Sequence, residues 1–452
     1  MTLDDGLAAL QSEERKSLQQ FKGHLGELLA LRSLKLKSYG SRSIDDAFDF
    51  YRCIADDHRD ASIKSKPIRG LLEVAGERAL QNIMIFEGGN RFELSLPVVY
   101  GAGNRKPIRG RARSLFAACF ADVRVRGRSS VLEFEDALAL DFEEDELASI
   151  DDNLEYDPAI FRTCDRDGWV IDNTRAVPDI ELDEAMTLVG THSWEFGHWF
   201  SEYLAKYLMA AAACDLEHVP ILIDAGMPEQ HKEALRLLAS PAARLIELEF
   251  GQSARVRRLW CAPSPYYSPR WVEMNEKFSW GTHSPYPPTF APLMSEMARR
   301  LEPVGSNAGG PRRIFLSRKP GQHRQLRNGQ EIESIARSRG FEIVYPQDLS
   351  FREQAQLVQN ADFILGLFGS ACYLSYISKP GAKVLILNHP YTLEASLTIT
   401  PTIEARGIRA AILIGPNVNL HPIYPHFSDF EIPAPEFVRR LDEWLEENAI
   451  GA

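Results

Sequence analysis

The chain has 452 residues, more than a single hydrophobic core usually serves, so its length predicts two or three domains. Hydrophobic residues make up 44% of it and charged residues 25%, the balance of an ordinary soluble globular protein. The formal net charge of −12 argues against a nucleic-acid-binding protein, because phosphates require a basic surface.

The six cysteines stand singly and far apart, without the pairing typical of zinc sites or disulfide frameworks. The N-terminal stretch MTLDDGLAALQSEERKSLQQ is acidic and has no apolar signal-peptide core. No apolar run approaches the roughly 18 residues that span a bilayer. We therefore expect a cytoplasmic protein with no transmembrane segment, which leaves room for peripheral contact with a membrane. The oligomeric state is unknown from the sequence.

The chain divides into four segments by pattern. Residues 1–65 have apolar positions at helical spacing and are expected to form an N-terminal helical segment. Residues 66–184 contain short β-like runs punctuated by turns, such as NIMIFEGG and ADVRVRGRSSVLEF, and predict a strand-rich section with few helices. In residues 185–304, strands VPILIDAG and RLIELEF flank the helix PEQHKEALRLL.

Residues 305–452 alternate more regularly, after a polar, glycine-containing linker at 305–311. Strands are expected at RRIFLSR, FEIVYP, ADFILG and AKVLILN, with helices between them and an amphipathic helix, PEFVRRLDEWLEENA, near the end. Such alternation is typical of parallel, doubly wound sheets. The fold class predicted is therefore α/β, with two Rossmann-like domains (185–304 and 305–452) facing a cleft and an N-terminal helical and strand-rich extension.

A basic loop follows the first strand of the last segment. The strand ends in Ser317 and Arg318, and the next ten residues bring four more basic side chains and an asparagine: Lys319, His323, Arg324, Arg327 and Asn328. Ligands of open α/β sheets bind beyond the carboxyl ends of the strands, and guanidinium groups suit phosphate. The loop therefore predicts a diphosphate site, with a solvated basic loop as the alternative.

A glycine turn follows the strand ADFILG and precedes a short helix. Gly366 and Gly369 allow a ligand to approach the backbone, and a helix N-terminus presents free N–H groups to an anion. Ser370 is also a natural helix cap, which is the structural alternative. Together with the arginine loop of the same sheet, the turn favours a diphosphate site.

The helix SWEFGHWFSEYLAKYL carries a possible acid–base pair. His198 and Glu202 are four residues apart, one turn along the helix, so the carboxylate can orient the imidazole as a general base for a hydroxyl group. A His–Glu pair on a helix surface is the structural alternative. No His-x3-His or clustered Cys/His set suggests a metal, and Asp165-Arg-Asp167 fits a hairpin turn better than a metal-binding D-x-D motif.

The stretch from Ile314 to Leu387 resembles glycosyltransferase family 61, which includes xylosyl- and N-acetylglucosaminyltransferases and many bacterial polysaccharide enzymes. The matching positions there are Ser317, Arg318, Arg324, Asn328, Glu331, Gly340, Phe341, Val344, Pro346, Leu349, Ser350, Glu353, Gln354, Ala361, Gly366, Gly369, Ser370, Pro380 and Gly381. Upstream, His198, Trp199 and Glu202 resemble the His-Trp motif of the family.

Three positions depart from the family pattern. Phe368 replaces the histidine of the glycine turn, Glu195 stands where an asparagine is usual, and Ala205-Lys206 replaces Pro-Arg. Loss of the turn histidine removes a polar group that could face the donor. Glu195 adds a carboxylate that could serve as the base.

The resemblance implies a GT-B-like fold and inverting, metal-independent transfer of a sugar from a nucleotide sugar to a hydroxyl of a glycan or lipid-linked saccharide. A UDP-sugar is the expected donor. On this basis residues 185–304 form the acceptor side and 305–452 the nucleotide-sugar domain, with no further cofactor. The implied catalytic residues are His198, Glu202 and Glu195. The implied donor-binding residues are Arg318, Arg324, Asn328, Glu353, Gln354, Gly366, Gly369 and Ser370. Two alternatives remain open: a catalytically degenerate sugar-nucleotide- or glycan-binding protein, and a nucleotide-sugar epimerase or hydrolase.

Overall fold

The structure is a computed structural model of the whole chain, and it describes residues 63–103, 106–143, 160–162, 169–172, 178–249, 252–266, 285–305, 312–321, 324–421 and 425–449. The expected N-terminal helical segment lies outside the described residues up to residue 62, and residues 63–65 begin strand β1 (Ile63–Lys66) instead. His323, the Asp165–Asp167 turn and residues 306–311 of the linker also lie outside the described residues.

The first sheet has four parallel strands at one end, in the order β14-β13-β12-β15, with β14 at the edge. Their bounds are β12 (Ile180–Thr187), β13 (Ile221–Asp224), β14 (Leu245–Leu248) and β15 (Ser253–Cys261). The helix α8 (Glu229–Leu238) joins β13 to β14, and β12 is joined to β13 by one continuous helical segment. That segment comprises α6 (Phe196–His198), the π-helical turn η3 (Trp199–Tyr203) and α7 (Leu204–Ala213). The strand order reverses between β12 and β15, which makes their carboxyl ends a topological switch point.

The strand-rich section extends this same sheet. β7 (Leu115–Arg126) pairs antiparallel with β15, and β3 (Ala79–Phe86) pairs with β7. The sheet ends in three short strands, β8 (Leu132–Glu133), β9 (Leu138–Leu140) and β2 (Ile68–Gly70), with helix α4 (Leu71–Arg78) packed against it. Hydrogen bonding of the sheet therefore crosses the boundary that was expected at residue 184.

The second sheet has six parallel strands in the order β17-β16-β18-β19-β20-β5. Its strands are β16 (Arg313–Leu316), β17 (Glu342–Val344), β18 (Phe363–Leu367), β19 (Lys383–Asn388), β20 (Arg409–Ile414) and β5 (Val98–Tyr100). The first five follow the order 2-1-3-4-5, which places a switch point between β16 and β18. The sixth, β5, comes from the strand-rich section, so that section contributes to both sheets.

Helices cover both faces of the second sheet. They are α11 (Gly329–Ser338), α12 (Phe351–Asn360), the 3₁₀ helix η5 (Ser370–Ile377), α13 (Leu393–Ala405) and α14 (Ala434–Ala449). Buried strands of a parallel sheet are apolar on both faces, which explains why continuous apolar runs marked them in the sequence. The small remaining pieces are the β1-β11-β10 sheet, the β4–β6 and β21–β22 pairs and the short helices η4, η6 and η7. Their bounds are β11 (Trp169–Asp172), β10 (Ile160–Arg162), β4 (Arg91–Leu94), β6 (Ile108–Arg111), β21 (Asn417–Asn419), β22 (Asp429–Phe430), η4 (Pro346–Asp348), η6 (Pro390–Thr392) and η7 (Pro425–Phe427).

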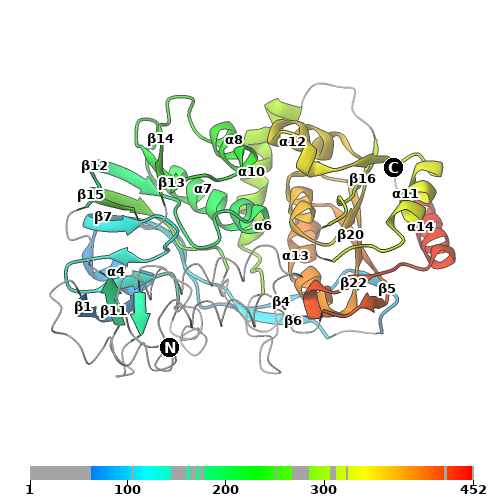
Figure 1. Cartoon of the computed structure of the whole chain (residues 1–452), viewed down its shortest axis with the longest axis horizontal. Helices are drawn as coiled ribbons and strands as arrows, with labels where there is room; N and C mark the ends of the chain where they lie inside the picture. Colours follow the sequence, from blue (N-terminus) through cyan, green and yellow to red (C-terminus); the bar gives the residue numbers. More distant parts are fainter. Residues whose placement is uncertain are drawn as a thin grey trace, which may run out of the picture.

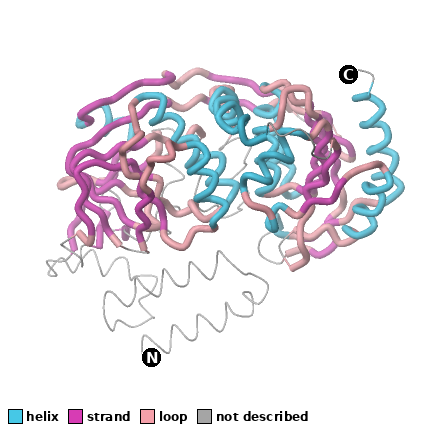
Figure 2. The backbone as a smooth tube through the Cα atoms, turned by 90° about the horizontal axis from the view of Figure 1, so that it is seen from above, coloured by secondary structure: helices cyan, strands magenta, loops and turns pink. Residues whose placement is uncertain are grey.

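The two α/β halves lie side by side with helices between their sheets (Figures 1 and 2). The long helix α10 (Phe290–Gly305) contacts α7 and α8 of the first half and α12, α13 and η5 of the second. One hydrophobic core runs through both halves, including Trp199, Phe200 and Phe290 as well as Phe351 and Tyr376. The helical layer therefore fixes the carboxyl ends of the two sheets relative to each other.

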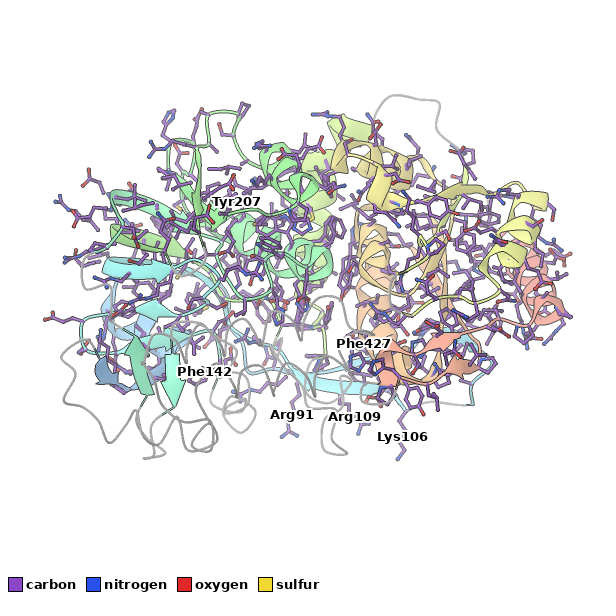
Figure 3. The ribbon with its side chains drawn as sticks, viewed as in Figure 1. Arg91, Lys106, Arg109, Phe142, Tyr207 and Phe427 are labelled. Carbon is purple, nitrogen blue, oxygen red and sulfur yellow. The ribbon has the colours of Figure 1, made fainter. Side chains whose placement is uncertain are left out.

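The β4–β6 ribbon crosses beneath both halves, and its labelled side chains Arg91 and Arg109 point away from the body, as does Lys106 beside it (Figure 3). Cys119, Cys214, Cys261 and Cys372 are free thiols. Within the described part of the chain, no helix has the length and apolar character needed to cross a membrane.

Candidate active site

The His198–Glu202 pair lies at the switch point of the first sheet. Nδ1 of His198 is 2.5 Å from Oε1 of Glu202, within the π-helical turn that follows α6. Such turns widen the helix locally and are frequent at functional sites. Glu202 is only 6% exposed, whereas the imidazole is partly accessible. The pair is therefore not a surface ion pair, which was the structural alternative.

The loop after β15 holds the carboxylate of Glu202 in place. Oγ of Ser264 donates to Oε2 of Glu202 (2.9 Å), and the hydroxyl of Tyr266 donates to Oε1 (3.4 Å). Both oxygens of the buried carboxylate are thus hydrogen-bonded, as a buried charge requires. Glu202 can orient His198 because it is itself fixed from the far side.

The strand-rich section anchors that loop. The backbone N–H of Ser264 donates to Asp141 (2.5 Å), and Nη1 of Arg113 donates to the carbonyl of Ser264 (2.9 Å). Asp141 and Arg113 also form an ion pair with each other at 2.9 Å. Residues from before position 184, to which the sequence assigned no chemistry, therefore support the position of Glu202.

Glu195 and His192 complete the cluster from the loop after β12. Oε2 of Glu195 is 3.4 Å from Nε2 of His198, and its Oε1 is 3.0 Å from Nδ1 of His192. The two imidazole rings stack with centroids 4.6 Å apart. The loop is held by buried Asp224 at the end of β13, which accepts from Gly190 N–H (2.9 Å) and Ser193 Oγ (2.5 Å).

The charges of this cluster depend on its carboxylates. Burial lowers the pKa of His198, but the charge and hydrogen bond of Glu202 and the charge of Glu195 outweigh that effect and raise it to about 9. Burial likewise raises the pKa of Glu202, and the charge of His198 more than reverses this, to about 2. In the ligand-free protein at neutral pH, the pair is therefore an imidazolium beside a carboxylate.

The same cluster corrects one expectation from the sequence. The spacing of histidines and cysteines suggested no clustered metal ligands, yet His192, Glu195 and His198 bring potential ligand atoms within 4.8 Å of one another. The three residues are each three positions apart, but they extend from a loop into the start of a helix. The sequence pattern therefore did not indicate that their side chains meet. A metal at this position would compete with a proton for Nε2 of His198.

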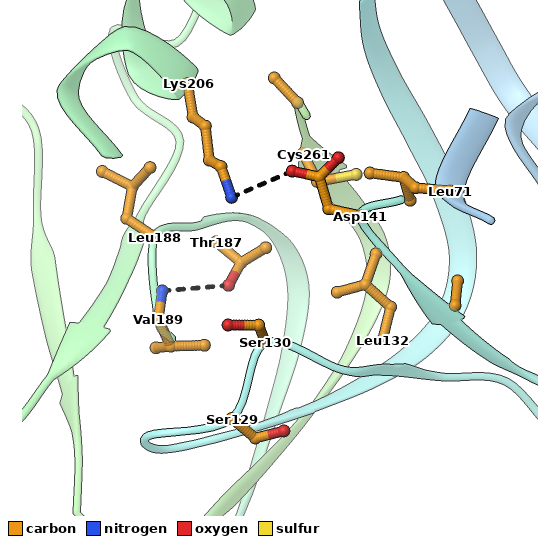
Figure 4. A pocket seen from close by; sticks show the side chains of 12 residues that line it. Leu71, Ser129, Ser130, Leu132, Asp141, Thr187, Leu188, Val189, Lys206 and Cys261 are labelled. Atoms are coloured by element: carbon orange, nitrogen blue, oxygen red, sulfur yellow. Dashed lines mark hydrogen bonds and ion pairs between the residues drawn. The ribbon is translucent and has the colours of Figure 1, made fainter. Parts of the chain in front are cut away.

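A cavity of about 40 Å³ lies among the end of β12, the loop before β8 and Lys206 of α7 (Figure 4). Its polar lining includes Ser129, Ser130 and Thr187, together with Asp141 and Lys206, whose side chains face each other at 3.6 Å. This volume holds one or two water molecules. The cavity is too small for a sugar, so it is not the substrate site.

Arg318 and Arg324 lie together at the switch point of the second sheet. Arg318 donates from Nη1 to the carbonyl of Arg324 (3.1 Å) and from Nη2 to the carbonyl of Phe368 (2.9 Å). Arg324 adopts a left-handed backbone (φ 58°), and its buried Nε has no hydrogen-bond partner among the described residues. Burial, and for Arg318 also the charge of Arg324, lower the pKa of both guanidinium groups.

The glycine turn adjoins these arginines. A Cβ at Gly369 would collide with Nη2 of Arg318 and lie 3.6 Å from Nη2 of Arg324, so only glycine lets the guanidinium groups approach the backbone. Gly366 lies inside β18, where a Cβ would meet Cys372 at ordinary contact distance. Ser370 is exposed and does not cap the helix; Gly369 occupies the cap position of η5. The turn and the arginine loop therefore meet as expected.

Three expected donor residues have structural roles instead. Glu353 and Ser350 form a capping box at the start of α12. The amide of Gln354 is buried and donates to the carbonyls of Pro346 (2.8 Å) and Leu349 (3.1 Å). Asn328 donates to the carbonyl of Ile432 (2.8 Å). Their polar groups are already used, so these contacts do not support a donor role for Asn328, Glu353 or Gln354.

Tyr373 of η5 lies between the two clusters. Its ring packs against the start of the acid–base helix, where a Cβ at Gly197 would lie 3.0 Å from Cε2 of Tyr373. Its hydroxyl is 3.1 Å from that of Tyr286. Burial raises the pKa of Tyr373 to about 12, and both Glu202 and Arg324 act on it electrostatically. Tyr373 therefore marks the place where the acid–base pair and the arginine site come together.

Sequence reasoning missed several residues of the site. Asp141, Asp224, Ser264 and Tyr266 come from separate elements and share no motif, so only the fold brings them together. Asp224 had a weak signal, as a carboxylate at the carboxyl end of a predicted strand. The stacking of His192 on His198 had none.

The fold and site define an α/β protein in which paired arginines at one sheet edge adjoin a histidine–carboxylate pair at another. Residues 196–385 match the family model described as Glycosyltransferase 61, and the match contains both clusters' central residues, from His198 to Gly369. This part of the chain is thus similar to glycosyltransferase family 61, and the match supports a transferase that uses a sugar donor and an acceptor. No curated protein matches the chain significantly.

Proposed function

We propose that this protein transfers a sugar from a nucleotide-sugar donor, with inversion at the anomeric carbon and without a catalytic metal, to a hydroxyl of a glycan or lipid-linked saccharide. The observation that carries the proposal is that Tyr373, four residues after the Gly369 turn that adjoins Arg318 and Arg324, packs against Gly197 beside the His198–Glu202 pair. On this view the two Rossmann-like halves form a GT-B arrangement, and a UDP-sugar is the first donor to examine.

The arginine site supplies the stabilisation of the leaving group. As the bond from the anomeric carbon to the diphosphate breaks, negative charge grows on the phosphate oxygens. Two fixed guanidinium groups and the backbone of the Gly369 turn can stabilise that charge, which in other transferases is the role of a divalent cation. Their electrostatic effect is large because burial keeps water away from them.

The His198–Glu202 pair supplies the base. The unprotonated imidazole takes the proton of the acceptor hydroxyl at Nε2, while Glu202 holds Nδ1–H and stabilises the imidazolium that forms. The oxygen then attacks the anomeric carbon from the face opposite the diphosphate, which inverts the configuration. Glu195, 3.4 Å from Nε2, lies where it can orient the acceptor hydroxyl or receive the proton.

The acceptor is proposed to bind beside the loop after β12. Trp194, the neighbour of Glu195, is 39% exposed, and the guanidinium group of Arg128 lies over its ring, 4.4 Å from the centroid. The exposed part of the indole is suited to the apolar face of a sugar ring. The place of this reaction would be the cytoplasm, on a growing bacterial surface polysaccharide. Basic side chains such as Arg91 and Lys106 leave room for contact with a membrane surface that carries the acceptor (Figure 3).

The test is a binding and turnover screen of the purified chain. Ligands that bind only the folded state raise the melting temperature, so UDP-, GDP-, CMP- and TDP-sugars are compared with and without chelator. One selective, chelator-insensitive shift, followed by release of the matching nucleotide when acceptor glycans are added, supports the proposal. Failure of every nucleotide sugar to shift the melting temperature contradicts it.

A binding protein without activity is the second candidate, and one observation favours it. Phe368 in the glycine turn is an apolar, 8% exposed side chain, so this position offers the donor no side-chain hydrogen bond. Stable donor binding without nucleotide release in the presence of many acceptors would support that candidate. Conversion of the donor, or release of free sugar, in the absence of any acceptor would indicate an epimerase or hydrolase.

A further inference from the structure

The buried histidine His389 lies at the same sheet edge as the two arginines, directly after strand β19. Strands β18 and β19 pair so that Leu367 lies opposite Leu387, and the N–H of Phe368 donates to the carbonyl of Leu387 (2.9 Å). The register continues to place His389 next to the Phe368–Gly369 turn. The carbonyl of that same Phe368 accepts from Arg318.

Both ring nitrogens of His389 are without a hydrogen-bond partner among the described residues, although the residue is only 1% exposed. Burying a polar group without a partner is costly, and native proteins rarely do so without a reason. His231 is almost as buried (3% exposed), yet its Nδ1 is 3.2 Å from the carbonyl of Ser193. Burial alone therefore does not explain the unpartnered imidazole of His389.

The surroundings of His389 keep its imidazole neutral. Burial, and then the charges of Arg324 and Arg318, lower its pKa to about 3. A neutral imidazole has one N–H donor and one nitrogen acceptor. Its ring lies near that of Phe430, with the two centroids 5.5 Å apart. Because Phe430 has no polar side-chain atom, this contact provides no hydrogen-bond partner for the ring nitrogens of His389.

The nearby Arg324 also has a buried nitrogen without a hydrogen-bond partner among the described residues. This nitrogen is Nε, and the backbone of the residue is held in a left-handed conformation. Strained and unsatisfied groups that gather at one sheet edge are typical of functional sites. One bound anion could satisfy both side chains.

We propose that His389 is a ligand-contacting residue of the arginine site, where one ring nitrogen donates to a phosphoryl oxygen held by Arg318 and Arg324 and the other accepts from a hydroxyl of the same ligand. This assignment rests on the proposed function, because it takes the ligand to be a nucleoside diphosphate that carries a sugar. His389 lies outside residues 196–385, so the family match does not cover it. Phe368, next to which the strand register places it, contributes no polar side chain to the site.

The experiment compares His389→Leu and His389→Gln with a matched control, Thr400→Val. Thr400 on α13 is also fully buried with an unpartnered hydroxyl, but it belongs to neither cluster. Melting temperature is measured for the ligand-free proteins, and binding of UDP and of inorganic pyrophosphate is measured by calorimetry. His389→Leu is expected to weaken both ligands on the order of tenfold or more. It is also expected to melt higher than the wild type without ligand, because an unsatisfied polar group is removed.

His389→Gln is expected to recover part of the affinity, since its amide can donate and accept, and Thr400→Val is expected to bind as the wild type does. Unchanged affinity of His389→Leu for both ligands overturns the assignment, even if Arg324→Ala abolishes binding and the proposed function stands. If the wild type binds pyrophosphate but not UDP, the result would count against the proposed donor. The affinity of His389→Leu for pyrophosphate would then still decide the role of His389. A wild type that binds neither ligand overturns both proposals.

Discussion

The acid–base cluster and the arginine site differ in how their polar atoms are partnered. In the first half, both oxygens of Glu202 accept hydrogen bonds, and Asp141 and Asp224 each fix a loop through several bonds. In the second half, Nε of Arg324 and both ring nitrogens of His389 are buried without partners among the described residues. His231 in the first half is nearly as buried as His389 and has a hydrogen-bond partner, so burial alone does not account for this difference.

The comparison suggests a division of roles. A group that must transfer a proton has to be held in one geometry before the substrate arrives, and the protein supplies all of its supporting bonds. A group that binds an anion can be left incomplete, at a cost of about 1–3 kcal/mol for each unsatisfied atom, since the ligand completes it. Mutations in the two regions should therefore separate turnover from binding and stability.

The largest expected effect is that of His198→Ala, which removes the proposed base. Turnover should fall by about 10²–10⁴-fold while donor affinity stays close to that of the wild type, because the arginine site is untouched. Initial rates of nucleotide release and calorimetric donor binding provide the two measurements. His218→Ala, a change of an exposed histidine before β13, is the control. Wild-type rates for His198→Ala would remove the base assignment.

The opposite pattern is expected for Arg324→Ala. Loss of one charged hydrogen-bonding group should weaken nucleoside-diphosphate binding by about 1.5–3 kcal/mol, roughly 10- to 150-fold. Arg327→Ala is a close control because it removes the same charge from the same loop, from a side chain that is 52% exposed and 3.6 Å from Asp429. Equal losses in both variants would mean that net charge, rather than a site at Arg324, attracts the nucleotide.

Local patterns predicted the strands and helices of both parallel sheets well. The helix expected between the strands FEIVYP and ADFILG is α12 (Phe351–Asn360), and the run AKVLILN contains β19, because buried strands and capped helices leave short-range signals. The place of β5 could not be foreseen, since Val98–Tyr100 pairs with β20 more than three hundred residues later. No local pattern encodes such a pairing.

The site was predictable only in part for the same reason. The spacing of four residues was enough to place His198 beside Glu202, and the strand end was enough to place Arg318 near the glycine turn. Positions that resembled the family motif at Glu353 and Gln354 proved to hold a helix cap and a loop. A family motif contains residues that stabilise the fold as well as residues that take part in the reaction. The sequence alone does not distinguish these two kinds of residue.

A smaller effect with a distinct pH signature is expected for Glu202→Gln. Since the pKa of His198 is about 9, the rate of the wild type should rise with pH up to that region as the imidazole loses its proton. Removing the carboxylate should move this rise to lower pH and reduce the maximal rate on the order of tenfold, because the imidazole itself remains. A pH–rate profile of kcat shows both changes. A rate that is flat between pH 6 and about 9 in the wild type would exclude His198 and favour Glu195.

The same pair makes a prediction for stability, with its sign fixed by the two pKa shifts. His198 has a folded pKa above its ordinary 6.5, so its contribution is full below that pH and disappears as the pH rises through about 9. Glu202 has a folded pKa below its ordinary 4.5, so its contribution is full above that pH and disappears as the pH falls towards about 2. The melting-temperature difference between wild type and Glu202→Gln should thus be greatest between pH 4.5 and 6.5 and shrink towards pH 9.

The smallest catalytic effect is expected for Asp141→Asn, and it tests whether the strand-rich section supports the reaction. Asp141 accepts from Ser264 N–H and pairs with Arg113, and Ser264 in turn fixes Glu202. The substitution weakens this chain of contacts by on the order of 1 kcal/mol without touching any reacting atom, which corresponds to about a fivefold loss of kcat. Donor affinity should be unchanged, as should the pH at which the rate rises if the geometry of Glu202 survives. Asp122→Asn is the matched control, because Asp122 lies on β7 at the surface, is 61% exposed and pairs with the exposed Arg255. A loss of kcat in Asp141→Asn alone would show that residues before position 184 position the catalytic carboxylate, whereas equal behaviour of the two variants would confine the chemistry to the two α/β halves.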